Sequence, residues 1–578
     1  MMPKSSRLFR MTSGEWSLVA VHDVLAAAVP EREMVVCGDV RRTYGEIADR
    51  SRSLAAFLSA RGLGVRRERD ELERWECGQD TVALVLHNSV EYIEAMLGAL
   101  RARAVPFNVN QHYRPAEVGA LLTDLGTRAV VHHRALGPLV AAACDATPGC
   151  DLAQLVLVDV DDGSGTAPLP GSTPFDEAAR TTVTTPLPDA SPDDLYLVCT
   201  GGTTGRPKAV LWRQADIYVS AMAGAEDATA DSIAAAAAAG GGGWYAVPPL
   251  MHAAAQWTAF SGLHNGGTVV LHDDSQPFDA RVILELAERE KVGMMSIVGD
   301  AYAGPLVDEL RRRPYDLASL RILGTGGAAT GEQHKEALLD LLPQLTIVDG
   351  YGASETGGMA FGARSRATRP AGFAPGAGAD VASDDRTRFL APGDDEIGWT
   401  ARRGRVPLGY LGDPERTEAT FPVIDGELVA IPGDRAQRLP DGSIRMLGRD
   451  AMVVNTGGEK VFVEEVEAVL RRHPDVADAL AVGRPSDRFG QEVVAVVAPR
   501  AGTTLDPGAL REFVAADIAR FKAPRAVAVC DAVRRHANGK ADYRWAQDVA
   551  RTAIDATGGI GHLDATGGSG SPDATGGR

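Results

Sequence analysis

The sequence predicts an α/β protein: a large N-terminal part of βαβ-built sheets with a small β-rich subdomain, followed by a smaller α+β C-terminal domain. Strand-like and helix-like segments alternate through the first 350 residues, which is typical of parallel sheets. Short strands separated by turn sequences follow, and then a mixed pattern. With 578 residues, the chain also exceeds the ~250–300 residues at which a single core stops growing.

The first periodic segment, residues 17–29, follows several basic residues and therefore resembles a signal peptide. However, Glu15, His22 and Asp23 lie in or beside it, and its apolar residues are spaced as on a helix. We predict an ordinary first helix. No run of ~18 apolar residues occurs elsewhere, so we expect no membrane span.

Residues 81–110 are patterned as strand, helix and strand, which is a βαβ unit. Strand-like runs at 129–133, 155–160 and 346–350 each follow a helical or turn segment. These repeats favour a mostly parallel sheet. The charged stretch 66–76, just before the first unit, is predicted to be a solvated insertion.

Residues 371–449 contain short apolar runs separated by Gly, Pro and Asp turns, a pattern that predicts antiparallel β structure. After residue 450 the pattern mixes helices and buried strands, including a helix over 510–521. We predict domain limits of 1–448 and 449–550, followed by a disordered Gly-rich tail over 551–578.

Composition narrows the possible partners. Apolar residues make up 45% and charged residues 24%, as in ordinary soluble globular proteins. The net charge of −18 argues against nucleic-acid binding but does not exclude a small anionic ligand, which a few N–H groups can hold. The six cysteines contain no CxxC pair and are too sparse for a disulfide framework or structural zinc site. We therefore expect core thiols in a cytoplasmic protein.

Two segments have low complexity. Residues 233–243 are almost entirely Ala and Gly, and we expect a surface loop or frayed helix there. The sequence DATGG recurs at Asp555, Asp564 and Asp573. Gly/Asp nonapeptide repeats bind calcium in β-rolls, but here the Asp falls one position late, so a disordered tail is favoured.

The strongest chemical signal is the loop that follows a short strand near residue 198. Its glycines allow backbone N–H groups to turn inward, its threonines add hydroxyl donors and its lysine adds a positive charge, as a phosphate tail requires. These residues are Thr200, Gly201, Gly202, Thr203, Thr204, Gly205 and Lys208. The loop lacks the GK[ST] ending of a P-loop, which disfavours a P-loop phosphotransferase. A plain Gly/Thr turn is the alternative.

A second polar loop follows the strand-like run 346–350, and the carboxyl end of a parallel strand is where α/β folds bind ligands. Tyr351 could stack on a base, and Glu355 could hold a magnesium ion that bridges phosphates. The alternative is a packed aromatic residue and a solvated acid.

Together the two loops resemble those of the adenylate-forming superfamily, which includes acyl-CoA synthetases. The chain has Gly201 where the family usually has Ser, and Ser354 where it usually has Thr. Further segments match the family in order: the adenine loop 324–329, the ribose motif 432–434, the hinge 447–450, the start of the mobile domain 455–467 and the catalytic-lysine loop 534–544. The resemblance covers about residues 16–550.

The resemblance implies an N-terminal adenylation domain, a mobile C-terminal lid that pivots at Asp450, and ATP, Mg2+ and CoA as cofactors. It implies Lys540, Glu355, Thr200 and His252 as catalytic residues, with Glu355 and Thr200 also at the metal. Beyond the loop 200–208, it implies that nucleotide and CoA are bound by a further set: Gly326, Gly327, Ala328, Asp349, Gly350, Tyr351, Gly352, Ser354, Asp434, Arg449, Gly457 and Gly458. On residues alone, His252 could be a satisfied core histidine and Lys540 a solvated basic residue.

The implied reaction activates a carboxylic acid as acyl-AMP and transfers it to CoA. The wider context is similar to actinobacterial acyl-CoA synthetases for steroid side-chain and other long or bulky acids. Small residues in 251–262 and 324–328 would leave room for a wide hydrophobic acid. Alternatives are an acyl-AMP ligase that serves a carrier protein or amine, and a non-catalytic nucleotide-binding protein. Neither the acid nor the oligomeric state follows from the sequence.

Overall fold

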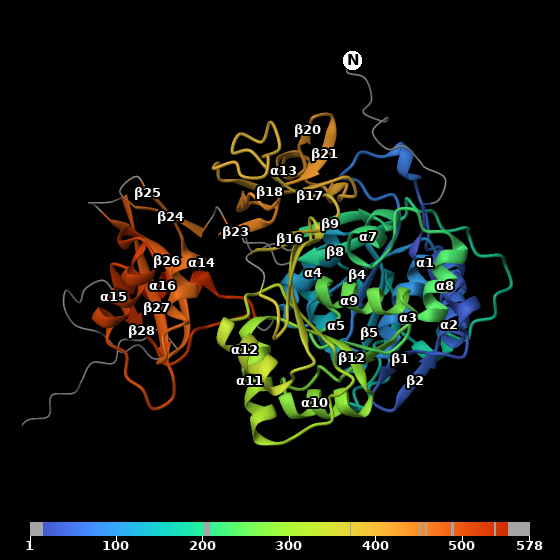
Figure 1. Ribbon diagram of the computed structural model, residues 1–578. Coiled ribbons are helices and arrows are strands. Elements are labelled where there is room, and N and C mark those ends of the chain that lie inside the picture. The colour runs from blue at the N-terminus through green and yellow to red at the C-terminus, as the bar shows by residue number, and fades with distance from the viewer. Residues whose placement is uncertain are drawn as a thin grey trace, which may run out of the picture.

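The computed structural model describes residues 15–200, 208–369, 372–449, 452–456, 459–486, 490–536 and 539–552. A large body contains the elements up to strand β23 (Ile444–Arg449), and a smaller body contains those from β24 (Val453–Thr456) onward (Figure 1). The predicted limits 1–448 and 449–550 place the domain boundary near the end of β23. Of the predicted tail 551–578, only residues 551 and 552 belong to the described ranges.

A nine-stranded sheet forms the centre of the large body. In sheet order its strands are β16 (Ala374–Pro375), β15 (Gly357–Arg364), β14 (Thr346–Ala353), β13 (Ile322–Gly326), β12 (Val292–Ile297), β10 (Gly243–Ala246), β11 (Thr268–Leu271), β1 (Glu33–Cys37) and β2 (Val40–Thr43). The strands from β14 to β1 are parallel, and the outermost pairs at both ends are antiparallel.

A second, five-stranded sheet is entirely parallel. Its order is β4 (Val105–Asn108), β3 (Thr81–Val85), β5 (Thr127–His133), β6 (Val156–Val160) and β7 (Thr173–Pro174). Strands β3 and β4 are joined by helix α3 (Val90–Arg101), so the predicted βαβ unit over 81–110 is confirmed.

Two antiparallel sheets complete the large body. One contains β19 (Gly409–Tyr410), β9 (Lys208–Arg213) and β8 (Leu195–Thr200). The other contains β20 (Val423–Ile424), β21 (Glu427–Ala430), β18 (Gly398–Arg403), β22 (Asp434–Arg438) and β23, with β17 (Ala379–Ala382) paired to β18. The predicted antiparallel structure of 371–449 is therefore confirmed.

The small body is a five-stranded sheet of β25 (Glu459–Phe462), β24, β27 (Gly490–Pro499), β26 (Val476–Ser486) and β28 (Ala526–Val529). Helices α14 (Val463–Leu470), α15 (Pro507–Asp517) and α16 (Tyr543–Thr552) pack on it. The predicted helix 510–521 is wrong in extent, because α15 ends at Asp517 and a separate 3-10 turn, Arg520–Lys522, follows. That turn brings the Lys522 ammonium to 2.7 Å from a Glu465 carboxylate oxygen on α14.

The helices of the large body lie between and around its sheets. They are α1 (Leu18–Ala28), α2 (Tyr44–Ala60), α3, α4 (Pro115–Asp124), α5 (Gly137–Ala146), α6 (Phe175–Ala178), α7 (Gln214–Ala221), α8 (Ala230–Ala239), α9 (Ala253–His264), α10 (Ala280–Arg289), α11 (Gly299–Arg312), α12 (Glu332–Leu341) and α13 (Pro414–Thr420). Helix α1 confirms the predicted first helix, and the Ser17 hydroxyl accepts its Ala20 N–H. Among the described residues no helix is both long and apolar enough to cross a membrane.

The Ala-rich segment is a helix capped at both ends rather than a loop. Thr229 and Ser232 form a capping box at the start of α8. At the other end the Arg32 guanidinium donates to the Ala237 and Gly266 carbonyl oxygens at 2.5 and 2.9 Å. The last carbonyl groups of a helix need such donors, and a distant arginine supplies them here.

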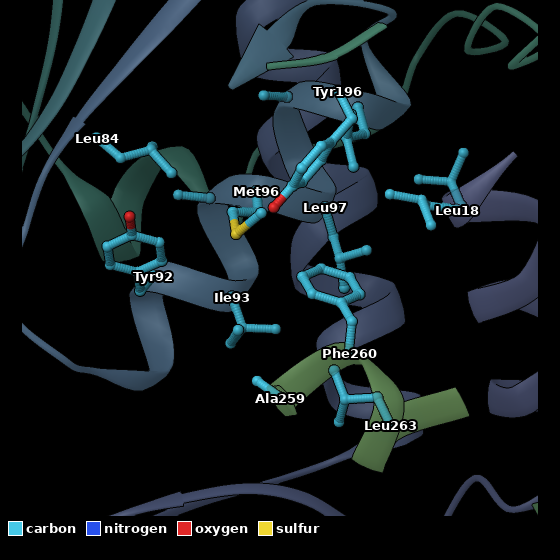
Figure 2. Close-up of a cluster of buried hydrophobic side chains, with 14 of the residues drawn as sticks. Leu18, Leu84, Tyr92, Ile93, Met96, Leu97, Tyr196, Ala259, Phe260 and Leu263 are labelled. Carbon is cyan, nitrogen blue, oxygen red and sulfur yellow. The ribbon is translucent and has the colours of Figure 1, made fainter. Parts of the chain in front are cut away.

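The largest core cluster lies where α3, α9 and strand β8 meet. Figure 2 shows α3 side chains, among them Ile93 and Leu97, between Phe260 of α9 and Tyr196 of β8. Tyr196 is fully buried, and its hydroxyl donates to the Gln256 amide oxygen on α9. This packing fixes β8, which leads into the predicted phosphate loop.

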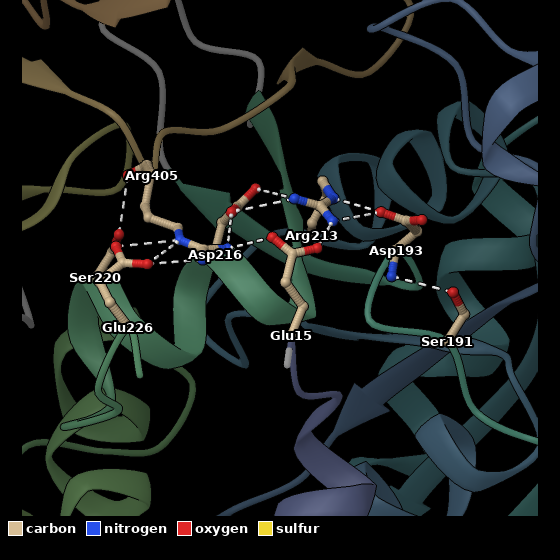
Figure 3. Close-up of polar contacts among 8 residues, drawn as sticks. All are labelled: Glu15, Ser191, Asp193, Arg213, Asp216, Ser220, Glu226 and Arg405. Carbon is tan, nitrogen blue, oxygen red and sulfur yellow. Dashed lines mark hydrogen bonds and ion pairs between the residues drawn. The ribbon is translucent and has the colours of Figure 1, made fainter. Parts of the chain in front are cut away.

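A buried ion cluster ties Glu15, which precedes α1, to the end of β9 and the start of α7 (Figure 3). The Arg213 and Arg405 guanidinium groups both contact the Glu15 carboxylate, at 2.6 Å each, and both contact Asp216. Burial would raise the pKa of Glu15, but the two arginines lower it. Burial prevails at Asp216, whose pKa is raised. Arg405 thus anchors the segment that leads into β19.

The substitution Arg405→Ala should destabilise the protein by about 3–5 kcal/mol, because it leaves the buried carboxylates of Glu15 and Asp216 with one guanidinium instead of two. Chemical denaturation measures the change. The matched control is Arg180→Ala, whose exposed ion pair with Asp176 should contribute no more than about 0.5 kcal/mol. Equal, small effects of both substitutions would contradict the assigned role of the cluster.

Candidate functional site

The predicted phosphate loop connects the two strands of an antiparallel hairpin. Thr200, at the end of β8, pairs with Lys208, at the start of β9. Gly201, Gly202, Thr203, Thr204 and Gly205 lie outside the described residues. Lys208 is half-buried, and its ammonium lies 5.2 Å from the centre of the Tyr410 ring. Burial and the Arg416 charge lower the pKa of Lys208, whereas Glu355 opposes them.

The second predicted loop, between β14 and β15, is held against this hairpin. The buried Trp212 indole of β9 donates to the Ser354 carbonyl oxygen at 2.9 Å. Within the turn, the Thr356 hydroxyl accepts the Ala353 N–H at 2.9 Å. The Tyr410 hydroxyl donates to a Glu355 carboxylate oxygen at 2.7 Å. Glu355 is therefore held in position on the same side as Lys208.

Tyr351 and Asp434 meet across two sheets. The Tyr351 hydroxyl donates to the Asp434 carboxylate and lies 3.3 Å from the Thr400 hydroxyl. The Arg449 guanidinium lies 3.3 Å from the other Asp434 oxygen. Burial and the Asp434 charge together raise the pKa of Tyr351 well above its usual value. The proposed base-stacking and ribose-binding residues therefore form one connected group.

The predicted adenine loop follows β13 beside this group. A Cβ added to Gly326 would lie 2.7 Å from the Gly350 carbonyl oxygen, so the close approach of the two strands requires glycine there. Gly327 has φ +74°, a left-handed conformation that favours glycine. Ala328 lies so close to Gly299 that a Cβ on Gly299 would be 2.9 Å from the Ala328 methyl carbon. The Asp349 carboxylate is paired with the Lys335 ammonium at 2.8 Å.

Lys540 reaches the large body from the small one. A Cβ added to its neighbour Gly539 would lie 3.4 Å from the Val298 carbonyl oxygen, so the loop tip touches the start of α11. Lys540 retains exposed surface. Even so, lost hydration and the Arg449 charge lower its pKa, against the opposing effect of the Glu355 and Asp434 carboxylates. The structure thus brings Lys540 to the predicted nucleotide site.

His252 precedes α9 and faces the same region. Burial and the Lys540 charge lower the pKa of His252 to about 4, so the imidazole is neutral at physiological pH. Its Nε2 is buried and has no hydrogen-bond partner among the described residues. Buried polar atoms are usually paired, so this nitrogen is a candidate to meet a ligand, although the buried Nε2 atoms of His132 and His264 share the feature.

One residue that the sequence analysis missed holds this segment in place. The buried Asn108 amide, at the end of β4, donates to the Cys199 and Met251 carbonyl oxygens at 2.9 and 2.6 Å and accepts the Cys199 N–H at 3.0 Å. Asn108 thereby joins the phosphate-loop strand to the His252 segment. The roles of Asn108 and of Tyr410, which holds Glu355, become visible only when strands distant in sequence are paired in the structure.

One face of the nine-stranded sheet remains accessible beside the site. Met295, Ile297, Leu323 and Ile347 are buried against the helices on the opposite face. The alternating residues of β12, β13 and β14 are only half-buried, although their strands are central: Met294, Ser296, Gly324, Gly326, Val348 and Gly350. Most of these residues are small, so this face has room for an apolar ligand.

The structure thus brings together Thr200, Lys208, Tyr351, Glu355, Asp434, Arg449, Lys540 and His252 from both bodies. Gly457, Gly458 and the predicted pivot Asp450 lie outside the described residues. Cys199 is buried, which raises its pKa and agrees with a packing role. In the described part of the chain, no group of three or more His, Cys, Asp or Glu side chains forms a metal cage.

Comparisons with known proteins agree with this arrangement. A family model described as "AMP-binding enzyme" matches residues 23–399, and one described as "AMP-binding enzyme C-terminal domain" matches residues 465–540. The first match covers more than half of the chain, and the second ends at Lys540.

Two curated relatives align over nearly the whole chain. A "Medium-chain acyl-CoA ligase Mig" from Mycobacterium avium is 42% identical over 548 residues, which cover 93% of this chain and 99% of the relative. A "Medium/long-chain-fatty-acid--CoA/3-oxocholest-4-en-26-oate--CoA ligase" from Mycobacterium tuberculosis is 39% identical, covering 92% and 96%. The crystal structure of the anthranilate CoA ligase AuaEII with anthranoyl-AMP matches with a TM-score of 0.75 at 20% identity, over 94% of this chain and 99% of that one.

Proposed function

The chain belongs to the AMP-binding enzyme family, and from this premise we propose that it is an acyl-CoA ligase that activates medium- to long-chain or steroid side-chain acids with ATP. The observation that supports this most is the contact of the Lys540 loop with the large body at Val298, together with the electrostatic influence of Glu355, Asp434 and Arg449 on Lys540. Such a group can bind a nucleotide and a carboxylate together.

In the first half-reaction, a carboxylate oxygen of the acid attacks the α-phosphorus of ATP, and pyrophosphate leaves. The protein does little covalent chemistry here, so position and charge decide the rate. Lys540 would hold the acid carboxylate against the α-phosphate, and the loop 200–208 would hold the leaving pyrophosphate. Tyr351, Asp434 and Arg449 would hold the nucleoside.

Glu355 and Thr200 fit a magnesium ion that accompanies the nucleotide. Mg2+ is usually held by one or two carboxylates together with substrate phosphates rather than by an all-protein cage. A single carboxylate held by the Tyr410 hydroxyl agrees with that preference. When bound, the ion would neutralise phosphate charge.

In the second half-reaction, the small body would rotate about Asp450, withdraw Lys540 and bring Gly457 and Gly458 over the acyl-AMP. The CoA thiol sulfur would then bond to the acyl carbon, AMP would leave and the thiol proton would pass to solvent. Such hinge motions assemble two sites from one fold. The neutral His252 would face the acyl carbonyl in both halves.

Incubation with ATP, Mg2+, CoA and a panel of medium-chain, long-chain and steroid side-chain acids tests the proposal. We expect acyl-CoA, detected by mass, with at least one acid. Pyrophosphate release without a thioester would instead identify an acyl-AMP ligase. ATP binding without pyrophosphate release from any acid would identify a non-catalytic nucleotide-binding protein.

The substitution Lys540→Ala should lower the adenylation rate at least ~100-fold, because it removes a charge that stabilises the transition state, and should change ATP affinity little. Arg544→Ala, which removes an exposed charge in the same body, is the matched control. The cation is the active form and its pKa is lowered, so the wild-type rate should fall with rising pH below the ordinary lysine value of 10.5. Lys540→Arg should remove this alkaline decline; an unchanged decline would assign it to another group.

The substitution Gly324→Leu should narrow the accessible face of the sheet. A Cβ there already lies 3.2 Å from the Met294 methyl carbon, so a leucine must project into the open space. We expect kcat/KM for a steroid side-chain acid to fall about 10–200-fold, with a much smaller change for a medium-chain acid. Equal losses for both acids would contradict the assignment of this face to the acyl group.

A further inference from the structure

The loop that carries Lys540 is a tight hairpin with its own support. Arg535 and Ala541 form an antiparallel bridge. The Gly539 N–H donates to the His536 carbonyl oxygen, and the His536 N–H donates to the Lys540 carbonyl oxygen, each at 2.8 Å. Gly539 has φ +77°, so the chain turns sharply just before Lys540. These hydrogen bonds lie within the loop and do not attach it to the central sheet of the small body.

Arg535 makes that connection. Its Nε and Nη2 atoms donate to the two Asp478 carboxylate oxygens of β26, each at 2.8 Å. A bidentate pair of this kind fixes the plane of the guanidinium as well as its position. From that plane, Nη1 donates to the Gly539 carbonyl oxygen at 3.2 Å. The peptide group that precedes Lys540 is therefore tied to the central sheet of the small body.

The support extends inward as a row of alternating charges: Arg535, Asp478, Arg471 and Glu467. The Arg471 Nε lies 3.3 Å from Asp478, and its Nη2 donates to Glu467 at 2.8 Å. Glu467 is 2% exposed and also accepts the Ala481 N–H at 2.9 Å. Glu467, at the inner end of the row, is therefore buried with both carboxylate oxygens hydrogen-bonded. Arg535, at the outer end, contacts the loop that carries Lys540.

We propose that Arg535 is a positioning residue that places Lys540 for the adenylation half-reaction and has no part in thioester formation. This rests on the proposed function. The loop tip lies against Val298 and Ala301 of the large body, so a small displacement of Gly539 moves Lys540 relative to the nucleotide site. A misplacement of about 1 Å can cost about 100-fold in rate.

The test separates the two half-reactions. In Arg535→Ala, pyrophosphate release with saturating acid and ATP should fall about 100-fold, because Lys540 is misplaced. Thioester formation from supplied acyl-AMP and CoA should change less than about threefold, because Lys540 is withdrawn in that half. Arg535→Lys should be intermediate, since an ammonium cannot make the bidentate pair and reach Gly539 at once.

Arg534→Ala is the matched control, because the neighbouring Arg534 side chain is 65% exposed and contacts only Asp542, at 3.4 Å, among the charged groups of the described residues. It should leave both half-reactions unchanged. Arg535→Ala should fold, because Asp478 keeps Arg471 as a partner. An equal loss of both half-reactions, or of neither, would overturn the proposal.

Hydrogen exchange supplies a readout that requires no acid, ATP or CoA. The His536 and Gly539 amides should exchange about tenfold faster in Arg535→Ala than in wild type and should be unchanged in Arg534→Ala. If the wild type makes no acyl-AMP, the proposed function fails, while this measurement still decides whether Arg535 holds the loop. Unchanged exchange would show that it does not.

Discussion

The hydrogen bond from the Trp212 indole to the Ser354 carbonyl oxygen fixes strand β9, which begins at Lys208, against the turn that carries Glu355. Trp212 is fully buried in the middle strand of a three-stranded sheet, so the donor cannot move without disturbing the core. The same strand begins at Lys208 and ends at Arg213, in the ion cluster that also holds Arg405. Its neighbour β19 brings Tyr410 to Glu355. Lys208, Glu355 and the supporting ion cluster are therefore connected through β9 and β19.

The charge at the site is opposite in sense to that of the whole chain. The protein has a net charge of −18, yet Lys208, Arg449 and Lys540 all lie near Glu355, and Arg449 also pairs with Asp434. Burial together with mutual repulsion lowers the pKa of both lysines, which means that the site is held at an electrostatic cost. Binding of an anion would relieve that cost, so the local arrangement favours a small anionic ligand although the overall charge repels long polyanions.

Sequence reasoning could predict what depends on local pattern and motif order. The βαβ unit, the antiparallel region and the approach of Lys208, Glu355 and Lys540 all followed from it. It could not predict contacts made by residues distant in sequence, such as Asn108 on Met251. The Arg32 guanidinium, about 200 residues earlier, donates to the Ala237 carbonyl oxygen near the end of helix α8, a contact that the Ala-rich segment itself does not reveal. Likewise, the apolar periodicity continues to Phe521, but α15 ends earlier and the following turn places Lys522 on Glu465.

The connection between the two bodies differs from the buried ion clusters within each body. At Gly448, with φ +107°, an added Cβ would collide with the Glu464 carboxylate of α14, so the small body packs directly on the end of β23. One Glu464 oxygen accepts a 3.3 Å bond from the Arg449 N–H, and the other has no hydrogen-bond partner among the described residues. Burial raises the Glu464 pKa to about 7, which further reduces its charge near neutrality. Each body has its own buried ion network, so the ion pairs that hold each body together do not depend on this joint, and the proposed rotation would leave them intact.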